Sequence, residues 1–390
     1  MIDFARADYG QAERDAVKRV LDSDWLASGT ENENFEKEFA DYVGTKYAVC
    51  LNSGSSANLL ALASLGLEKE SKILTSACGF PATLSPILHL GFNPVLVDYD
   101  VETHNINLEQ VLRELPNVDA IIFAHTMGNP VAVDVIVEEA KRHGVKVIED
   151  CCEAVGSTLN GKYVGSFGDV GTYSFYPSHQ MTAGGMGGML VTNDRGVWTR
   201  AKEFRDWGKT WCWDEKLGDN KTMYDFDIGV GYRYYRHYVY AQAGYNFKLA
   251  EMNAAFGREQ LKKLEHFKRV RYQNYETLEE GLLKLEDFLD VKVSKNSDPC
   301  WFGFILTLKD GSNLDRNDFG NFLESRGIRH RPFFAGNITR HVPFGPSQDF
   351  PVADKLMRDS LFIGCHTKMI DEHCQFIITE IKAYVDSINP

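Results

Sequence analysis

The chain has 390 residues, of which 44% are hydrophobic, and its formal net charge is −13. This length suits a large domain joined to a smaller one, and the acidic balance argues against non-specific binding to nucleic acid or to an anionic membrane. The N-terminus is charged from the start and lacks the apolar core of a signal peptide. Because no apolar run is long enough to span a bilayer, we expect a cytoplasmic protein.

The first half of the chain alternates helical patterns with short apolar strands. Helices are predicted over residues 35–44, 55–67 and 135–144, and Gly44 and Gly144 end the first and the last of them. The strands between them cover residues 46–51, 72–77, 93–99, 120–126, 145–150, 172–175 and 187–193. This alternation predicts a mostly parallel sheet with helices on both faces.

The second half has a different pattern. Residues 209–244 are rich in Trp and Tyr and predict a loop excursion, and a long helical pattern follows over 249–285. Further elements predict a small α+β domain: strands over 300–308 and 328–334, a helix near 314–326 and two C-terminal helices. We therefore predict a large domain over residues 1–248 and a small one over residues 249–390.

Two motifs indicate an anion and a ring nitrogen as ligands. Asn52 to Asn58 (NSGSSAN) lie between a strand and a helix, where free N–H groups and the helix dipole favour a phosphate. A simple helix cap is the alternative. Asp150 ends an apolar strand, where open α/β sheets bind ligands. A carboxylate there can hold a pyridine nitrogen protonated, and a capping Asp is the alternative.

Two more motifs follow in the chain. Ser174 to Gln180 (SFYPSHQ) precede the glycine-rich turn of residues 184–188, which allows a close approach to a ligand or forms a tight turn. Gly244 to Leu249 (GYNFKL) are predicted to open the long helix.

Together, in this order and spacing, the four motifs resemble the sugar aminotransferases of the DegT/StrS type, a branch of the fold-type I pyridoxal phosphate (PLP) enzymes. The resemblance begins at Trp25 to Gly29 and covers nearly the whole chain. It implies an α/β, aspartate-aminotransferase-like fold and a homodimer with shared active sites. It also implies cofactor-binding roles: the phosphate for Gly54, Ser55 and Ser174, ring stacking for Phe80, the pyridine nitrogen for Asp150, and the neighbouring subunit's phosphate for Asn246.

The sequence departs from this family at two positions. His179 stands where the aminotransferases carry their Schiff-base lysine, and no lysine occurs between Lys162 and Lys202. Imidazole cannot tether PLP, but it can move protons near neutral pH. Glu153 stands where the aminotransferases have Gln, and it is expected to shape a hydrogen bond to the cofactor hydroxyl. His179 is therefore predicted to be the catalytic base of an untethered cofactor.

Both departures resemble the pyridoxamine phosphate (PMP)-dependent 3-dehydratases, which act on CDP- or GDP-linked 4-keto-6-deoxyhexoses. The stretches 206–208, 297–304 and 331–337 resemble that subgroup as well. Some of its members hold a [2Fe–2S] cluster, which needs about four thiolates. Here Cys212, Cys151 and Cys152 supply three at most, so we expect no metal site. The remaining cysteines are scattered without a CxxC pair and are predicted to be core residues: Cys50, Cys78, Cys300, Cys365 and Cys374.

The predicted function is removal of the C3 hydroxyl of a nucleotide-linked 4-keto-6-deoxy sugar, with L-glutamate as the amino donor that regenerates PMP. Arg331 is expected to meet a glutamate carboxylate or a sugar phosphate. Three alternatives remain open. These are another PLP/PMP reaction, such as amine transfer or deoxygenation at another carbon, a lysine-to-histidine variant of an aminotransferase, and a catalytically silent homologue that binds a sugar nucleotide or a partner protein.

Overall fold

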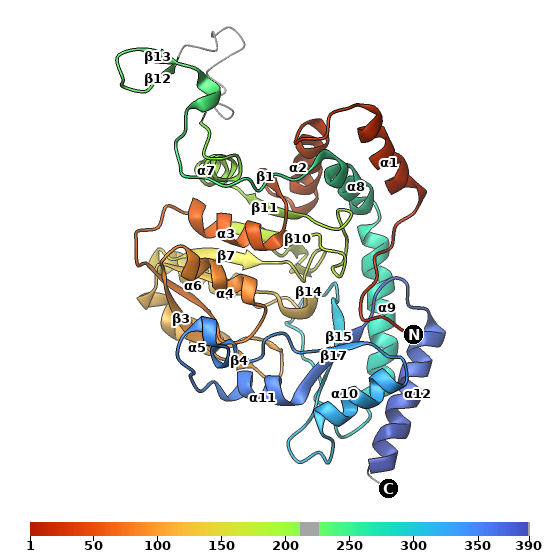
Figure 1. The fold of residues 1–390 in the computed structure, drawn as a ribbon. Coiled ribbons are helices and arrows are strands. Elements are labelled where there is room, and N and C mark those ends of the chain that lie inside the picture. Colours follow the sequence, from red (N-terminus) through yellow and green to blue (C-terminus); the bar gives the residue numbers. More distant parts are fainter. Residues whose placement is uncertain (211–225, 389–390) are drawn as a thin grey trace.

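The computed structural model describes residues 1–210 and 226–388, and a seven-stranded sheet forms its centre (Figure 1). The strand order is β1-β11-β10-β7-β6-β2-β3. Neighbouring strands from β10 to β3 are parallel, whereas β11 is antiparallel to both β1 and β10. The strands are β1 (Tyr47–Leu51), β2 (Lys72–Ser76), β3 (Asn93–Val97), β6 (Ala120–Ala124), β7 (Lys146–Asp150), β10 (Val170–Ser174) and β11 (Gly188–Thr192). The prediction of a mostly parallel sheet is confirmed.

Helices cover both faces of this sheet because successive side chains of a strand point to opposite sides. In β1, Val49 and Leu51 pack with residues of α3 (Gly54–Ser64), α4 (Pro81–His89) and α7 (Arg195–Arg205). Ala48 and Cys50 pack on the other face, against α2 (Thr30–Val43). Two further helices, α5 (Leu108–Glu114) and α6 (Val133–His143), continue that second layer. The strands therefore read as continuous apolar runs.

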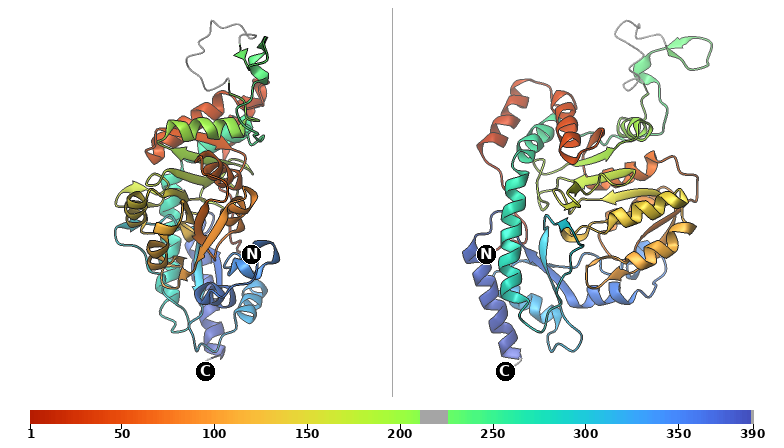
Figure 2. Two further views of the ribbon diagram at one scale, coloured as in Figure 1. Left: turned by 90° about the vertical axis from the view of Figure 1, so that its left-hand side faces the viewer. Right: turned by 180° about the vertical axis from the view of Figure 1, so that it is seen from behind.

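A smaller antiparallel sheet, in the order β15-β17-β16, forms the C-terminal part. Helices α9 and α12 lie side by side along it (Figure 2). The N-terminus also belongs here, because the N–H of Ile2 donates to the Gly327 carbonyl (2.7 Å) and the Ile2 carbonyl accepts from the N–H of Arg329 (2.8 Å). The elements are α9 (Leu264–Leu282), β15 (Gly303–Thr307), α10 (Arg316–Ser325), β16 (His330–Pro332), α11 (Pro351–Asp359), β17 (Ser360–Gly364) and α12 (Asp371–Ile388).

The prediction of one long helix over 249–285 is wrong in detail, because two separate helices, α8 (Glu251–Leu261) and α9 (Leu264–Leu282), occupy that stretch. Residues 244–249 do not open it. The backbone of Gly244 lies so close to Gly208 that a Cβ on Gly244 would be 2.3 Å from the Gly208 nitrogen, which leaves no room for a side chain, and residues 244–249 are not helical. Helix α8 packs on α1 (Gln11–Asp22) and α2. The domain boundary at residue 248 stays a prediction.

The predicted excursion over 209–244 is described only in part, because residues 211–225, including Cys212, lie outside the described residues. From residue 226 on, a small hairpin of β12 (Phe226–Asp227) and β13 (Arg233–Tyr234) projects away from the body (Figures 1 and 2). The remaining short strands are β4 (Tyr99–Asp100), β5 (Asn105–Ile106), β8 (Thr158–Leu159), β9 (Lys162–Tyr163) and β14 (Ser297–Asp298). Among the described helices, none is both long and apolar enough to cross a membrane.

Candidate active site

A cavity of about 300 Å³ opens at the carboxyl ends of β7 and β10, beside the first turn of α3. This edge is where parallel α/β sheets bind ligands. Seven of the nine predicted site residues line it: Gly54, Ser55, Phe80, Asp150, Glu153, Ser174 and His179. Asn246 and Arg331 are not among its lining residues. Among the described residues, no lysine or arginine lines this cavity.

The first turn of α3 forms an anion cradle in one wall. The Ser53 hydroxyl accepts a hydrogen bond from the N–H of Ser56 (3.1 Å) and caps the helix. The N–H groups of Gly54 and Ser55 have no partner inside the helix, as in any first turn, and the helix dipole points at the same place. A Cβ on Gly54 would be 2.7 Å from both Cys152 Sγ and Ser174 Cβ. Glycine therefore lets the cradle lie directly on the ends of β7 and β10.

Asp150 is held at the end of β7 by donors from three parts of the chain. Its Oδ2 accepts hydrogen bonds from Asn58 Nδ2 (2.7 Å) and Thr83 Oγ1 (2.8 Å), and its Oδ1 accepts from the N–H of Cys152 (3.1 Å). Such a buried carboxylate is fixed in direction. The sequence did not predict that Asn58 and Thr83 donate hydrogen bonds to Asp150, although Asn58 is the last residue of the NSGSSAN motif. No sequence signal marked Thr83.

Glu153 is a second buried carboxyl group in the same cavity. Its Oε2 accepts a hydrogen bond from the N–H of Met127 (2.8 Å), a residue with a positive φ of 56°. Burial, reinforced by the charge of Asp150, raises the pKa of Glu153 to about 8, although the Met127 hydrogen bond opposes the shift. Glu153 is therefore mostly protonated at neutral pH.

His179 is half-buried, and its ring lies 5.2 Å from that of Phe302. Its Nδ1 is buried and has no hydrogen-bond partner within the described part of the chain. Burial, together with the nearby charge of Arg271, lowers the pKa of His179 to about 3. Arg271 also donates to the His179 carbonyl (3.1 Å) and so fixes its backbone. The imidazole is neutral and able to accept a proton or a hydrogen bond.

An outer chamber of about 400 Å³ adjoins this cavity and shares Phe80, Ser178, Phe302 and Phe334 with it. Phe80, the predicted stacking residue, is 57% exposed and meets Phe334 edge to face at 6.4 Å. Arg331 lines the outer chamber, with its guanidinium carbon 4.2 Å from the centre of the Phe4 ring. No ion pair of Arg331 occurs among the described residues.

Asn246 lies apart from both chambers. It is exposed, and its backbone pairs with that of Asp206. The role predicted for it concerns the neighbouring subunit, which a single chain does not test.

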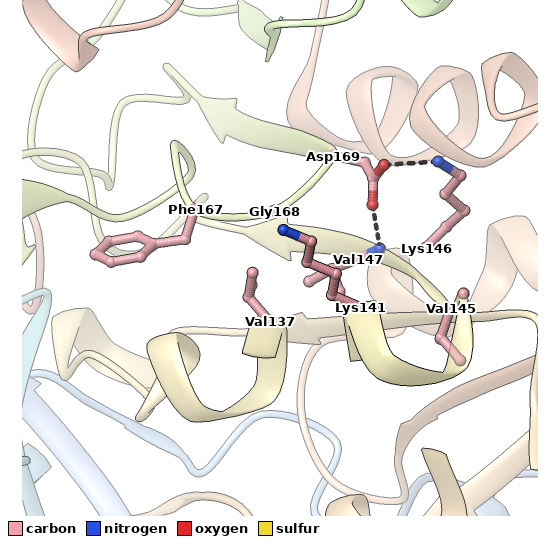
Figure 3. A pocket seen from close by; sticks show the side chains of 9 residues that line it. Val137, Lys141, Val145, Lys146, Val147, Phe167, Gly168 and Asp169 are labelled. Carbon is pink, nitrogen blue, oxygen red and sulfur yellow. Dashed lines mark hydrogen bonds and ion pairs between the residues drawn. The ribbon is translucent and has the colours of Figure 1, made fainter. Parts of the chain in front are cut away.

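Another hollow, of about 310 Å³, lies at the opposite edge of the sheet, where β7 begins (Figure 3). Its one carboxylate, Asp169, pairs with Lys146 (2.9 Å) and accepts the N–H of Val147 (2.9 Å). Both oxygens of Asp169 are therefore occupied by hydrogen bonds within the protein, and this hollow lacks the set of ligand-binding groups that lines the cavity.

A buried group of His125, Glu149 and Cys151 could hold a metal ion by spacing alone. Its ligand atoms are already used. The two Glu149 oxygens accept from His125 Nε2 (3.1 Å) and from three backbone N–H groups, and His125 Nδ1 accepts the N–H of Val131 (3.0 Å). The group therefore has a structural role, because its hydrogen bonds fix the backbone of residues 165–168. The expected absence of an iron–sulfur cluster stays a prediction, since Cys212 lies outside the described residues.

The cavity fits a pyridoxal-type cofactor. It combines an anion cradle, a carboxylate fixed by three donors and an exposed aromatic face. A phosphate, a ring nitrogen and a flat ring need these three features.

Comparisons with known proteins agree with this fit. Residues 7–382 match the DegT/DnrJ/EryC1/StrS aminotransferase family. A dTDP-4-dehydro-2,6-dideoxy-D-glucose 3-dehydratase of Saccharopolyspora spinosa is 37% identical, over 92% of this chain and 81% of the relative. The lipopolysaccharide biosynthesis protein RfbH of Salmonella typhimurium is 35% identical, over 94% and 88%. A GDP-perosamine synthase of Escherichia coli is 28% identical, over 95% of both chains.

Solved structures resemble the chain over nearly its whole length. The structure of an E. coli GDP-4-keto-6-deoxy-D-mannose-3-dehydratase with bound hydrated PLP is 29% identical, with a TM-score of 0.87 over 97% of this chain and 99% of that one. The predicted fold is confirmed.

Proposed function

The chain belongs to the DegT/DnrJ/EryC1/StrS aminotransferase family, and from this membership and the histidine in its cavity we propose that it is a PMP-dependent nucleotide-sugar 3-dehydratase. It is an enzyme of a PLP-dependent family that modifies nucleotide sugars, and its cofactor is PLP or PMP. The observation that carries the finer proposal is His179, which lines the cavity where no described lysine does. Imidazole forms no Schiff base but transfers protons.

Five of the predicted residues would hold the cofactor. The first turn of α3, with Gly54 and Ser55, would hold the phosphate together with Ser174. Phe80 would cover one face of the ring, and Asp150 would meet the ring nitrogen. When bound, the cofactor supplies an electron sink for the carbon atoms joined to it.

His179 would move the proton that this chemistry needs. Its neutral imidazole would take a proton from the C4′ carbon of the cofactor and deliver it to the C3 oxygen of the sugar, which leaves as water. The pKa of about 3 makes His179 a weak base in the cavity as it stands. The negative charges of the cofactor phosphate and the sugar diphosphate would raise that pKa when both ligands are bound.

L-glutamate would regenerate PMP. In sum, the sugar loses its C3 hydroxyl, glutamate becomes 2-oxoglutarate, and ammonia is released, so that glutamate supplies the two electrons. The substrate would be a nucleotide-linked 4-keto-6-deoxyhexose. This is supported by the relatives, because two of those described act on 4-keto nucleotide sugars by name.

Two copies of the chain would share their active sites. The hairpin of β12 and β13 supports this, because it projects from the body and exposes Tyr232, and the turn that follows it exposes Tyr238. Asn246 lies in the strand-like segment that returns from that hairpin, and it would serve the partner's phosphate.

Product analysis tests the proposal. The protein would be incubated with PLP, L-glutamate and a panel of CDP-, GDP- and dTDP-linked 4-keto-6-deoxy sugars, and the sugars would be analysed by mass spectrometry. We expect a product lighter by one oxygen, with ammonia released and no reductase added. His179→Asn should abolish this product while retaining PMP binding. His143→Asn, which removes a surface partner of Glu139 on α6, should leave it unchanged.

Amine transfer is the second candidate, favoured by the similarity to GDP-perosamine synthase. A product in which the ketone has become an amine would establish it and would overturn the role of His179. Turnover retained in His179→Asn would also overturn that role. No change to any sugar would contradict both reactions and favour a binding protein.

A further inference from the structure

Two carboxyl groups, Asp150 and Glu153, lie in one buried cavity three residues apart. No described lysine or arginine lines that cavity to neutralise a second negative charge. Like charges in a cavity of low polarity disfavour each other, so one group of such a pair keeps its proton. The hydrogen bonds decide which one.

Asp150 receives three donors, and Glu153 receives one. Asn58, Thr83 and the N–H of Cys152 stabilise a negative charge on Asp150. On Glu153, Oε2 accepts only the N–H of Met127, and no hydrogen bond of Oε1 occurs among the described residues. Because donors favour the charged form, the proton belongs on Glu153.

The other titratable groups around Glu153 carry no charge that would reverse this choice. They are Cys152 beside it in the chain, Cys78 at the end of the loop after β2, and Tyr99 in β4. Burial raises the pKa of both thiols and of the phenol, so all three are neutral near pH 7. Glu153 therefore faces one anion, Asp150, and three neutral groups.

We propose that Glu153 is a positioning residue that enters the cavity as a neutral carboxylic acid, is held by Met127, and donates its proton in a hydrogen bond to an oxygen of the cofactor. A carboxylate has no proton to donate and would repel a ring oxygen that carries negative charge. Deprotonation of Glu153 therefore weakens cofactor binding.

Retention of the cofactor should depend on pH for this reason. No described lysine lines the cavity to form a Schiff base with the cofactor, so non-covalent contacts would hold it. Burial and Asp150 raise the pKa of Glu153 to about 8. Below that pH the acid donates. Above it the donor is lost, and the cofactor should dissociate more readily.

The test is a fluorescence titration of the apoprotein with PMP between pH 6.5 and pH 9.5. PMP is the probe because its amine cannot react with surface lysines. In Glu153→Gln, the amide keeps a donor at every pH and also accepts the Met127 N–H. We expect the ratio of the wild-type Kd to the Glu153→Gln Kd to rise about tenfold between pH 7 and pH 9. The ratio cancels the titration of PMP itself.

Glu279→Gln is the matched control. Glu279 is a half-buried carboxyl on α9 whose pKa burial also raises, and it does not line the cavity. This variant should keep the pH dependence of the wild type. The proposal would be overturned if the ratio of the wild-type Kd to the Glu153→Gln Kd stayed constant between pH 7 and pH 9. It would also be overturned if Glu279→Gln lost the pH dependence of PMP binding to the same extent.

A second readout does not depend on the folding of a variant. The infrared carbonyl band of a protonated carboxyl group should be present in wild-type apoprotein at pH 7 and disappear by about pH 9.5. Its absence at pH 7 would overturn the proposal. The inference rests on the proposed function for the site alone. Both measurements omit sugar and glutamate, so failure of the dehydratase assignment and failure of the Glu153 assignment remain separate results.

Discussion

Individual residues in the cavity have their properties set by neighbours from other elements. Asp150 is fixed in direction because Asn58 of α3 and Thr83 of α4 both donate hydrogen bonds to it. His179 stays neutral because the fold buries it against Phe302 and near Arg271. A base and an acid of unlike pKa therefore lie in one small cavity, which is common where proton transfer is catalysed.

Gly54 is the residue at which the cradle tolerates least change. In Gly54→Ala the new Cβ would lie 2.7 Å from Cys152 Sγ and Ser174 Cβ, so the helix must move away from the strand ends. We expect at least a tenfold loss in PMP affinity, from about 1.4 kcal/mol of lost binding, and a loss of about 1–3 kcal/mol in the free energy of unfolding. Fluorescence titration and urea unfolding measure the two.

Gly10→Ala is the control, because a Cβ on Gly10 would meet no atom within 4 Å. PMP affinity should be unchanged in that variant. Unchanged affinity in Gly54→Ala would contradict the placement of the phosphate at α3.

At the scale of elements, the N-terminal segment and β16 together build the outer chamber. Ile2 is bonded to the backbone on both sides of Ile328, which brings the Phe4 ring under the guanidinium of Arg331. The Phe4 ring also packs on Phe362 of β17 at 6.1 Å. An arginine held over a ring, without an ion pair among the described residues, is ready to receive an anionic ligand.

Arg331→Gln should therefore weaken binding of an anionic ligand. We expect conversion of the bound PLP to PMP, followed by absorbance, to need about tenfold more L-glutamate in this variant, which corresponds to one lost charge-assisted hydrogen bond. Arg326→Gln, which removes a surface ion pair with Glu380, is the control. A normal glutamate requirement with a raised KM for the sugar would assign Arg331 to the diphosphate. If both are normal, Arg331 has no role in binding.

At the scale of the whole molecule, the hairpin of β12 and β13 stands apart from the body (Figure 2). Isolated two-stranded hairpins are at best marginally stable in water, and this one, together with the segment that follows it, exposes large apolar side chains between Ile228 and Tyr240. Such a surface is typical of an interface. A second copy of the chain would cover it and stabilise the hairpin.

Replacement of both Tyr232 and Tyr238 by Ser should shift the protein from dimer to monomer at micromolar concentration. These side chains are 64% and 61% exposed in the single chain, so their loss should cost the monomer little. Sedimentation velocity measures the change. Tyr272→Ser, at a 39% exposed site on α9, should stay dimeric. A wild-type monomer, or a dimer that withstands the double replacement, would contradict this role.

The sequence by itself determined the fold class and the seven strands of the large sheet, and it named nine candidate site residues, of which seven line this cavity. These features are local. Apolar runs bounded by turns form the strands, and ligand-binding groups of α/β folds follow strand ends or open helices. His179 and Glu153 were identified by their positions within such motifs.

Only the tertiary structure decided which groups act on one another. Thr83 lies 67 residues from Asp150, Met127 lies 26 residues from Glu153, and Phe4 meets Arg331 from the opposite end of the chain. The two chambers and the different sets of hydrogen-bond donors on Asp150 and Glu153 follow from such long-range packing. No local pattern encodes them, because burial and hydrogen bonding depend on which distant segments the folded chain brings together.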